Sequence, residues 1–323
     1  MRWHSRPMDI AVVDSVSSPP SVISATAVSK SWGSHSVFTD LTVEVPRGVT
    51  GLLGSNGSGK TTLLGMLLGL HHPDGGDLRI LGEDPAHAGP ELRQHIGYSP
   101  EHHDLPDDVA AQDLVRHIAQ IHGLPRREAT TRSSDALWLV GLGEERARPV
   151  GTMSTGQRQR VKLAQAIAHG PSIILLDEPT DGLDPVQRDD MLALIRRIGT
   201  EFEIDVLLSS HLLEEVERIA DNVVIVADGT VRAAGPISEL RSGRGGVIVQ
   251  VADRSAELAS ALRSSGLEID EQRDRILVGT TEAAEDLVDA IRDAVAAVQA
   301  PLRRLYPVEQ SLEELFLTEV HDA

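Results

Sequence analysis

The sequence predicts an α/β domain followed by a smaller α+β domain, and three observations lead to this prediction. An apolar run at Val49–Leu53 precedes a glycine-rich loop and then an apolar segment, 63–68, that favours a helix. Two further short apolar runs, 172–176 and 206–208, are typical of buried strands. The residues after Gly235 follow the pattern β-α-β-β-α-β.

The glycine-rich loop has the spacing G-x-x-x-x-G-K-[ST] between a predicted strand and a predicted helix, the context that this motif requires. Its glycines let the backbone curl so that N–H groups face phosphate oxygens, and the helix adds its positive N-terminal end. Lys60 is expected to reach the β- and γ-phosphates and Thr61 to bind Mg²⁺. For this segment alone, a turn before a core helix is the alternative. The predicted nucleotide-binding residues here are Gly54, Ser55, Asn56, Gly57, Ser58, Gly59, Lys60, Thr61 and Thr62.

An acidic pair ends the second predicted strand, since Asp177 and Glu178 directly follow residues 172–176. A Mg²⁺ site requires a carboxylate at the end of a strand, and we expect this strand to lie beside the phosphate-binding strand. Asp177 is predicted to hold the metal, directly or through water, and Glu178 to polarise the attacking water. A solvated acidic turn is the alternative, and the residues that follow, 179–185, disfavour it.

With these segments established, the chain resembles the ATP-binding cassette (ABC) ATPases over about residues 27–236. Further family motifs follow in family order: a Q-loop position at 96–101, a signature loop at 153–157, a D-loop at 182–185 and a switch histidine at His211. The resemblance implies a P-loop ABC ATPase cassette with a helical subdomain, and it implies ATP and Mg²⁺ as cofactors.

In this family each ATP is bound between two cassettes, so one chain contributes two half-sites. The resemblance implies that Ser154 and the amide of Gly156, at the start of a predicted helix over 156–168, contact the γ-phosphate held by the opposite subunit. Gln157 and Asp184 are counted with these nucleotide-binding residues. Ser154 also fits a plain helix cap, and the two roles are compatible.

Two more roles follow from the resemblance. His211 would donate a hydrogen bond to the γ-phosphate and hold Glu178 and the water in place. Trp32 would stack on the adenine, although a packing or surface aromatic is the alternative for this residue.

Two residues depart from the family pattern. Glu101 stands where the family usually has Gln, and because a carboxylate can also bind Mg²⁺, Glu101 is predicted as a metal ligand and as a catalytic residue. Thr155 stands where many members have Gly; its Cβ restricts the backbone but leaves the Ser154 hydroxyl and the Gly156 amide available. Neither departure predicts an inactive site.

The sequence also predicts how the chain divides. The expected parts are a disordered lead-in over 1–20, the ABC nucleotide-binding domain over 21–240 with a helical subdomain at about 102–160, a linker over 241–246 and a C-terminal accessory domain over 247–323. Helices predicted at 109–122 and 134–140 define the helical subdomain, whose face toward the Q-loop receives the membrane subunit in family members.

The C-terminal domain is predicted to be ferredoxin-like. Its expected elements are strands at Val247–Val251, 267–269, 276–278 and 302–306, with helices at 256–263 and 282–298. A capping box at 311–314 predicts a last helix. Residues 311–317 resemble the C-terminal end of drug- and lipid-exporter ATPases of the daunorubicin-resistance kind, and a helix packed on its own domain is equally compatible with them.

Composition narrows the partners. The formal charge of −19 argues against general binding to a phosphate backbone, so no nucleic acid partner is expected. The absence of cysteine excludes a disulfide framework and a thiolate metal site. The longest apolar stretch, 63–70, is far shorter than the ~20 residues that span a bilayer. The chain is therefore expected to be cytoplasmic, and peripheral at the inner face of the membrane through a permease.

The sequence thus predicts the Mg²⁺-dependent ATPase subunit of an ABC exporter. Two copies of the chain would clamp ATP, and their closure would drive a separate integral-membrane permease. The alternative is a non-transport cassette protein acting on the ribosome or on DNA. Ribosomal members usually fuse two cassettes, whereas this chain has one P-loop. DNA-repair members insert coiled coils or zinc modules between the P-loop and the signature loop, whereas that segment here has no cysteines and no heptads.

Overall fold

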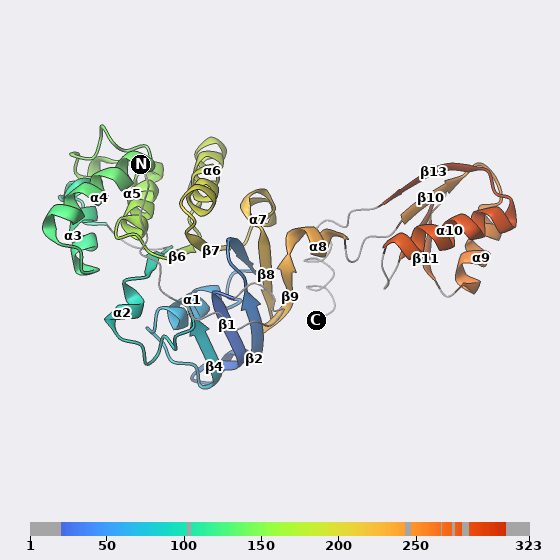
Figure 1. The fold of residues 1–323 in the computed structure, drawn as a ribbon, viewed down its shortest axis with the longest axis horizontal. Coiled ribbons are helices and arrows are strands. Elements are labelled where there is room, and N and C mark those ends of the chain that lie inside the picture. The colour runs from blue at the N-terminus through green and yellow to red at the C-terminus, as the bar shows by residue number, and fades with distance from the viewer. Residues whose placement is uncertain are drawn as a thin grey trace, which may run out of the picture. The chain divides into compact units, whose positions relative to one another are not determined.

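The computed structural model describes residues 21–101, 105–242, 247–265, 267–272, 275–279 and 284–307. The chain forms two compact units, Met1–Gly235 and Pro236–Ala323 (Figure 1). The predicted lead-in over 1–20 and the predicted last helix at 311–314 lie outside the described residues.

The first unit is built on a six-stranded sheet with the order β5-β6-β7-β3-β8-β9. Its pairs are parallel from β5 through β8. Every residue of β3, β6, β7 and β8 is buried, which explains their near-continuous apolar sequences. The strands are β3 (Val49–Leu53), β5 (Ile96–Ser99), β6 (Ile173–Asp177), β7 (Asp205–Ser210), β8 (Asn222–Ala227) and β9 (Thr230–Pro236).

The strand that ends in Asp177 is not the neighbour of the strand that precedes the phosphate-binding loop, so the predicted adjacency is wrong. β7 lies between β6 and β3. Parallel strands are joined by crossover connections, so the strand that follows along the chain can be placed one position away. The carboxyl ends of the parallel strands nevertheless share one edge of the sheet, and Asp177 remains in contact with Thr61 there.

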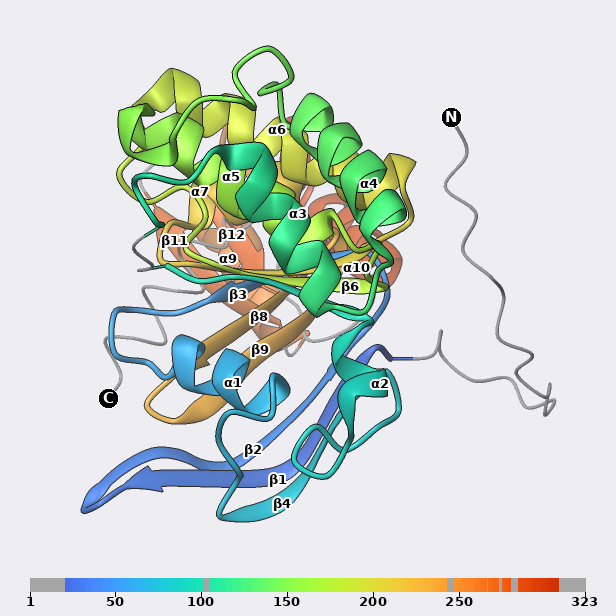
Figure 2. The ribbon, with the colours of Figure 1, turned by 90° about the vertical axis from the view of Figure 1, so that its left-hand side faces the viewer.

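Helices cover both faces of this sheet. Ile174 and Leu176 of β6 pack into a core with the helices α3 to α6, whereas Ile173 and Leu175 pack into a second core with α1. Figure 2 shows α1 on one side of the sheet and α5 and α6 on the other. The helices are α1 (Lys60–Leu67), α2 (Pro90–Arg93), α3 (Ala111–Ile121), α4 (Arg126–Leu139), a 3-10 turn (Val150–Thr152), α5 (Thr155–Ile167), α6 (Pro185–Glu201) and α7 (Leu213–Ile219).

Helix α4 begins eight residues earlier than the sequence predicts. Its first half is polar, and only Ala129 and Ser133 are buried before the apolar residues Ala136 and Leu137. A helix that buries small or polar side chains leaves no apolar periodicity to detect, so only its second half was predictable.

A second, antiparallel sheet of the order β2-β1-β4 covers α1 from the other side. It consists of β1 (Ile23–Trp32), β2 (His35–Val45) and β4 (Gly75–Ile80). Val37 and Phe38 of β2 pack against the phosphate-binding loop, where a Cβ added to Gly59 would lie 2.6 Å from Phe38 Cζ. The sheet therefore fixes one wall of that loop.

The second unit has the predicted element order. Its sheet has the order β11-β12-β10-β13, with all described pairs antiparallel. Each β-α-β segment has a strand of the other segment between its own two strands, which is the split βαβ arrangement of ferredoxin-like folds. The elements are α8 (Ile237–Ser242), β10 (Val247–Val251), α9 (Ser255–Ser264), β11 (Glu268–Gln272), β12 (Arg275–Gly279), α10 (Ala284–Val298) and β13 (Leu302–Pro307).

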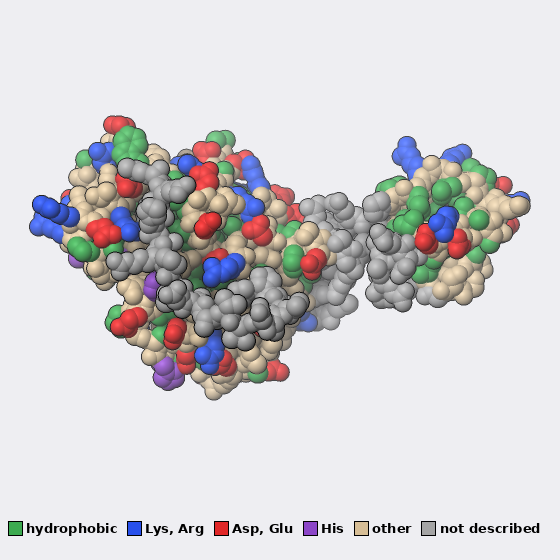
Figure 3. Space-filling view, viewed as in Figure 1, with side chains coloured by type: hydrophobic (Ala, Val, Ile, Leu, Met, Phe, Trp, Pro, Cys, Tyr) green, Lys and Arg blue, Asp and Glu red, His purple; other side chains and the backbone are tan. Residues whose placement is uncertain are grey.

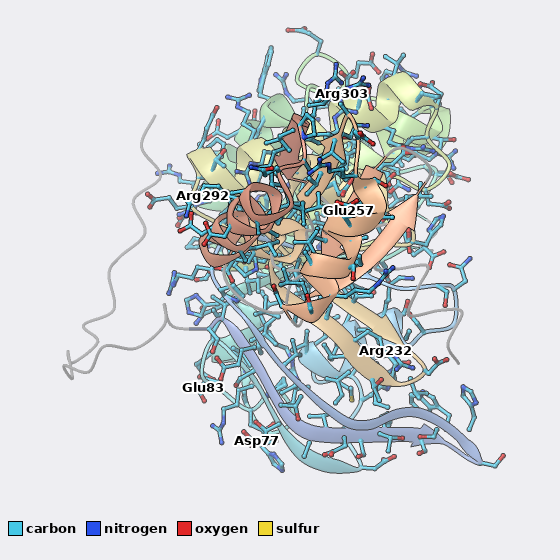
Figure 4. All side chains as sticks on the ribbon, turned by 90° about the vertical axis from the view of Figure 1, so that its right-hand side faces the viewer. Asp77, Glu83, Arg232, Glu257, Arg292 and Arg303 are labelled. Atoms are coloured by element: carbon cyan, nitrogen blue, oxygen red, sulfur yellow. The ribbon has the colours of Figure 1, made fainter. Side chains whose placement is uncertain are left out.

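Helices α9 and α10 lie side by side and carry Glu257 and Arg292 (Figure 4). Their apolar side, including Leu258 and Ile291, packs with Val249 of the sheet. Helix α8 extends to Ser242, so the first two residues of the predicted linker are helical.

On the face seen in Figure 3, acidic and basic side chains of the first unit are interspersed. Within the described residues, no helix is both long enough and apolar enough to cross a bilayer.

Candidate nucleotide-binding and catalytic site

The phosphate-binding loop needs glycine at three positions for two physical reasons. Gly57 and Gly59 have φ of 86° and 100°, in the left-handed region where a Cβ is strained. A Cβ on Gly54 would lie 2.6 Å from the carbonyl oxygen of Val226. The loop thus turns tightly between β3 and α1 and presents backbone amides beside the helix N-terminus, where an anion is favoured.

Lys60 points back into this loop. Its Nζ donates to the carbonyl oxygens of Gly54 at 2.7 Å and Ser55 at 3.3 Å, and it lies 3.3 Å from Glu178 Oε1. The side chain is only 7% exposed. A buried ammonium therefore stands at the centre of the loop, where the phosphates of a nucleotide would lie.

One polar atom in the loop has no partner. Ser58 Oγ is buried and forms no hydrogen bond within the described structure. A buried hydroxyl left unpaired costs about 1–3 kcal/mol, and a phosphate oxygen would remove that cost. Ser55, Asn56 and Gly57 are exposed, so the loop is open to a ligand on that side.

Thr61 and Asp177 form the candidate Mg²⁺ pair. Thr61 Oγ1 donates to Asp177 Oδ2 at 2.9 Å, and Thr61 is exposed whereas Asp177 is buried. Hydroxyl and carboxylate oxygens are the ligands that Mg²⁺ prefers, with water and phosphate oxygens completing its shell. These residues fit the ion. Thr62, one residue further along α1, is partly buried.

Ser209 orients both acidic residues, a role that the sequence reasoning missed. Its Oγ donates to Asp177 Oδ1 at 2.6 Å and accepts from the Glu178 N–H at 2.9 Å. Glu178 has φ of 45°, a strained conformation for a residue with a Cβ. The one available signal was the position of Ser209 two residues before His211.

Glu178 lies between Lys60 and His211. Its Oε2 is 2.9 Å from His211 Nδ1, on the side opposite the Lys60 contact. The Glu178 side chain is 8% exposed and that of His211 is 40% exposed. The pair is a buried carboxylate with an imidazole at its solvent side, which suits a base and the group that orients it.

Glu101 lies at the same edge of the sheet, two residues beyond the end of β5. Burial raises the pKa of Tyr98 to about 12, with further contributions from the charges of Asp177 and Glu101. Both carboxylates are thus near enough to the Tyr98 phenol for their charges to raise its pKa. The buried Lys162 of α5 donates to the backbone carbonyl of Glu101 at 2.8 Å, which fixes the main chain there.

Trp32 stands at the end of β1 with 48% of its surface exposed. Its ring meets His71 edge to face at 4.9 Å, and Lys30 Nζ lies 4.8 Å from the ring centre. His71 in turn packs on α1, where a Cβ on Gly65 would lie 2.8 Å from its ring. Trp32 is therefore attached to the P-loop helix through His71 and keeps much of its surface open.

The signature residues form a second cluster at the start of α5. Ser154 Oγ accepts from the Gln157 N–H and Gln157 Oε1 accepts from the Ser154 N–H, a complete capping box. Gln157 Nε2 also donates to Glu145. Asp184 caps α6 by accepting from the Gln187 N–H at 2.9 Å.

The two helix starts lie against each other. A Cβ on Gly156 would lie 2.6 Å from Gln187 Oε1. Gln159 Nε2 donates to the Asp181 carbonyl at 3.3 Å. Nine of the predicted site residues thus fall into two sets. One set contains Lys60, Thr61, Asp177, Glu178 and His211, and the other contains Ser154, Gly156, Gln157 and Asp184.

Comparisons with known proteins agree with this geometry. Residues 38–181 match the sequence model of the family described as "ABC transporter". The daunorubicin resistance ATP-binding protein DrrA3 of Streptomyces coeruleorubidus is 31% identical over 307 residues, 91% of this chain and 94% of that protein. The sulfate/thiosulfate import ATP-binding protein CysA of Nocardia farcinica is 35% identical over 215 residues, 66% of this chain and 65% of that protein.

A solved structure described as the ATP binding subunit of an ABC transporter has a TM-score of 0.60 and 28% identity, covering 68% of this chain and 92% of that one. The residues matched to the family model include the phosphate-binding loop and the acidic strand end. The chain belongs to the ATP-binding cassette family, as an ATP-hydrolysing subunit of a transporter.

Proposed function

We propose that this chain hydrolyses MgATP between two copies of itself and so powers an exporter whose membrane-spanning part is a separate permease. The observation that carries the catalytic half of this proposal is the connected set in which Glu178 bridges Lys60 and His211 while Thr61 bonds to Asp177. ATP hydrolysis is the reaction of the family, and the contacts in this set support the following role for each residue.

The loop and Lys60 bind and orient the phosphates. Lys60 would exchange its carbonyl partners in the loop for phosphate oxygens, and the same movement would end its contact with Glu178. Thr61 and Asp177 would hold Mg²⁺, which when bound neutralises phosphate charge and orients the γ-phosphoryl group. Glu101 would add a third oxygen ligand in place of the family's usual glutamine.

Glu178 then acts as the group that polarises the attacking water. Its carboxylate is buried and is freed on one side when Lys60 moves, while His211 keeps it in place on the other. A positioned base of this kind typically contributes roughly 10²–10⁴-fold to a rate. His211, which is part exposed, would also donate to the γ-phosphate.

The second cluster supports a sandwich dimer. Ser154 and Gly156 lie at the N-terminus of the 13-residue helix α5, and the contacts of Ser154 and Gln157 are with each other and with Glu145. A helix N-terminus of this length favours a phosphate. Gly156 lies against Gln187, the residue whose N–H Asp184 accepts from, and no described contact joins Ser154 or Gly156 to Lys60. We infer that Ser154 and Gly156 contact the nucleotide bound by the other copy, and that Trp32 stacks on the adenine of the nucleotide bound by its own copy.

The direction of transport is inferred from how far the relatives extend. The daunorubicin resistance protein matches 91% of the chain, so it includes the second unit, whereas the sulfate/thiosulfate importer matches 66%. The second unit is therefore shared with a protein whose name denotes drug resistance. We infer export, with the chain held peripherally at the inner face of the membrane by its permease.

Purification of the chain from the membrane fraction of its own cells tests this proposal. An integral protein with several membrane spans is expected to co-purify and to raise the ATPase rate. Recovery with ribosomes or DNA instead would contradict it. In vesicles with the ATPase facing outward and daunorubicin as the fluorescent probe, ATP should drive accumulation in the lumen, and ATP-driven loss from preloaded vesicles would contradict export.

A further inference from the structure

We propose that Glu215 is a positioning residue that fixes the segment carrying Glu178 against the segment carrying His211. The inference rests on the roles proposed above for Glu178 and His211. Glu215 touches neither the phosphate-binding loop nor the acidic strand end in any contact described above. It acts through two hydroxyl groups, each of which belongs to one of the two segments.

A single carboxylate oxygen makes both contacts. Glu215 Oε2 accepts from Thr180 Oγ1 at 2.9 Å and from Ser210 Oγ at 2.7 Å. Thr180 is two residues after Glu178, and Ser210 directly precedes His211. Glu215 therefore joins the turn after β6 to the end of β7 at the level of the Glu178–His211 pair.

The cluster is buried and carries charge. Glu215 and Thr180 are each 3% exposed, and Ser210 is fully buried. Glu215 Oε1 lies 3.3 Å from Arg188 Nε but has no hydrogen-bond partner within the described structure. A buried carboxylate paired this loosely contributes little to stability compared with an apolar side chain of similar size. Its benefit must then lie in the geometry that it imposes.

That geometry matters because the backbone at Glu178 is strained. Glu178 has φ of 45°, and its N–H is held by Ser209, the residue before Ser210. The turn that follows is closed by the Asp181 N–H bonding to the Glu178 carbonyl at 3.1 Å. Ser209 and Glu215 thus attach this turn to the end of β7 at two points, and loss of the second would let Glu178 shift relative to His211.

Two substitutions at this position separate the contact from the charge. Glu215→Gln keeps an oxygen that can accept from both hydroxyls but loses the ion pair, and the part-exposed Arg188 can turn to water. Glu215→Leu removes the acceptor altogether. Glu215→Leu should lower kcat for ATP hydrolysis by roughly 10²-fold with little change in KM for MgATP, since a small misplacement of a reacting group has costs of that size. Glu215→Gln should retain most of kcat.

Asp205→Asn is the matched control, because Asp205 is a buried carboxylate at the start of β7, the strand that ends at Ser210, and there it accepts from the Gly48 N–H. It should leave kcat unchanged. Thr180→Val and Ser210→Ala each remove one of the two hydroxyl groups that donate to Glu215. They test the positioning role if Glu215→Leu does not fold.

Three outcomes would overturn the inference. The first is a wild-type kcat in a folded Glu215→Leu protein, or in both Thr180→Val and Ser210→Ala. The second is an equal loss of kcat in Glu215→Gln and Glu215→Leu. The third is a loss of kcat in Asp205→Asn equal to that in Glu215→Leu. Glu178→Gln, measured alongside, keeps the two proposals distinct. If that variant hydrolyses ATP normally, the proposed function fails; if it is inactive while the Glu215 variants match the control, only the positioning role fails.

Discussion

Glu178 Oε2 lies 2.9 Å from His211 Nδ1 while the other oxygen of the same carboxylate lies 3.3 Å from Lys60 Nζ. One buried acid thus contacts both the lysine of the phosphate-binding loop and the histidine that follows β7. A base held by a cation on one side is not available to a water molecule there. We therefore expect nucleotide binding, which draws Lys60 toward phosphate, to be the step that makes Glu178 available.

Substitution of Glu178 by Gln should stop turnover and leave nucleotide binding intact. The amide keeps the size of the side chain and a contact for His211 but cannot accept a proton from water. Loss of a positioned base costs roughly 10²–10⁴-fold in rate. Phosphate release and equilibrium binding of ATP, measured on the same preparation, check this; phosphate release at the wild-type rate would show that Glu178 is not the base.

Ser209→Ala should weaken both the metal site and catalysis. It leaves Asp177 Oδ1 and the Glu178 N–H without their partner, and loss of a residue that orients metal ligands typically costs about 10–100-fold in affinity or activity. Hydrolysis measured against Mg²⁺ concentration should shift to higher concentrations. Ser172→Ala is the control, because Ser172 directly precedes the opposite end of β6. An equal shift in the Ser172→Ala variant would count against the role of Ser209.

Glu101 should tolerate a change to Gln better than a change to Ala. If its carboxylate binds Mg²⁺ as the family's usual glutamine would, Glu101→Gln keeps a ligand oxygen and should remain active. Glu101→Ala should reduce the stimulation of ATPase activity by the permease more than it reduces nucleotide affinity. Wild-type values of both quantities in the Ala variant would mean that Glu101 is only an acidic residue of the loop.

His169 should make stability depend on pH. Burial, with the neighbouring charge of His122, lowers its pKa from 6.5 to about 3, and Arg132 and His95 act in the same direction. Between these two values the unfolded chain binds a proton that the folded chain excludes, so the free energy of unfolding falls as pH falls. The slope from this one group reaches about 1.4 kcal/mol per pH unit.

Replacement of His169 by Gln removes this contribution while an amide can still donate to the Ile96 carbonyl that His169 Nε2 faces. Denaturant unfolding of both proteins at several pH values between the two pKa values measures the slope. The His169→Gln slope should be smaller, and identical slopes would show that His169 titrates normally in the folded protein.

The sequence predicted those parts of the site that a short local pattern specifies. The phosphate-binding loop and His211 each follow a buried strand, and Asp177 ends one. The carboxyl ends of these parallel strands share one edge of the sheet. The order of strands in the sheet depends on contacts between distant segments and not on local sequence. The sequence therefore did not predict β7 between β6 and β3. The order of the elements in the second unit was predictable from local patterns, whereas β11 (Glu268–Gln272) extends three residues beyond the strand predicted at 267–269.

Side-chain partners were the least predictable feature. Ser209 lies in a strand end and Glu215 in a polar helix, and neither local sequence indicates a special role. Only the fold brings Ser209 to Asp177 and Glu215 to Thr180. Helix α4 shows the same limit at the level of elements, since its buried residues Ala129 and Ser133 carry no apolar signal. Tertiary contacts, not local preference, decide such positions.

The central claim is that two copies of this chain enclose ATP between the loop of one and the signature residues of the other. The native mass of the Glu178→Gln protein, at micromolar concentration with and without saturating MgATP, tests it most directly. We predict a monomer without nucleotide and a dimer with it, and a weaker dimer when Ser154→Ala is added. A strictly monomeric species at saturating MgATP would contradict the account.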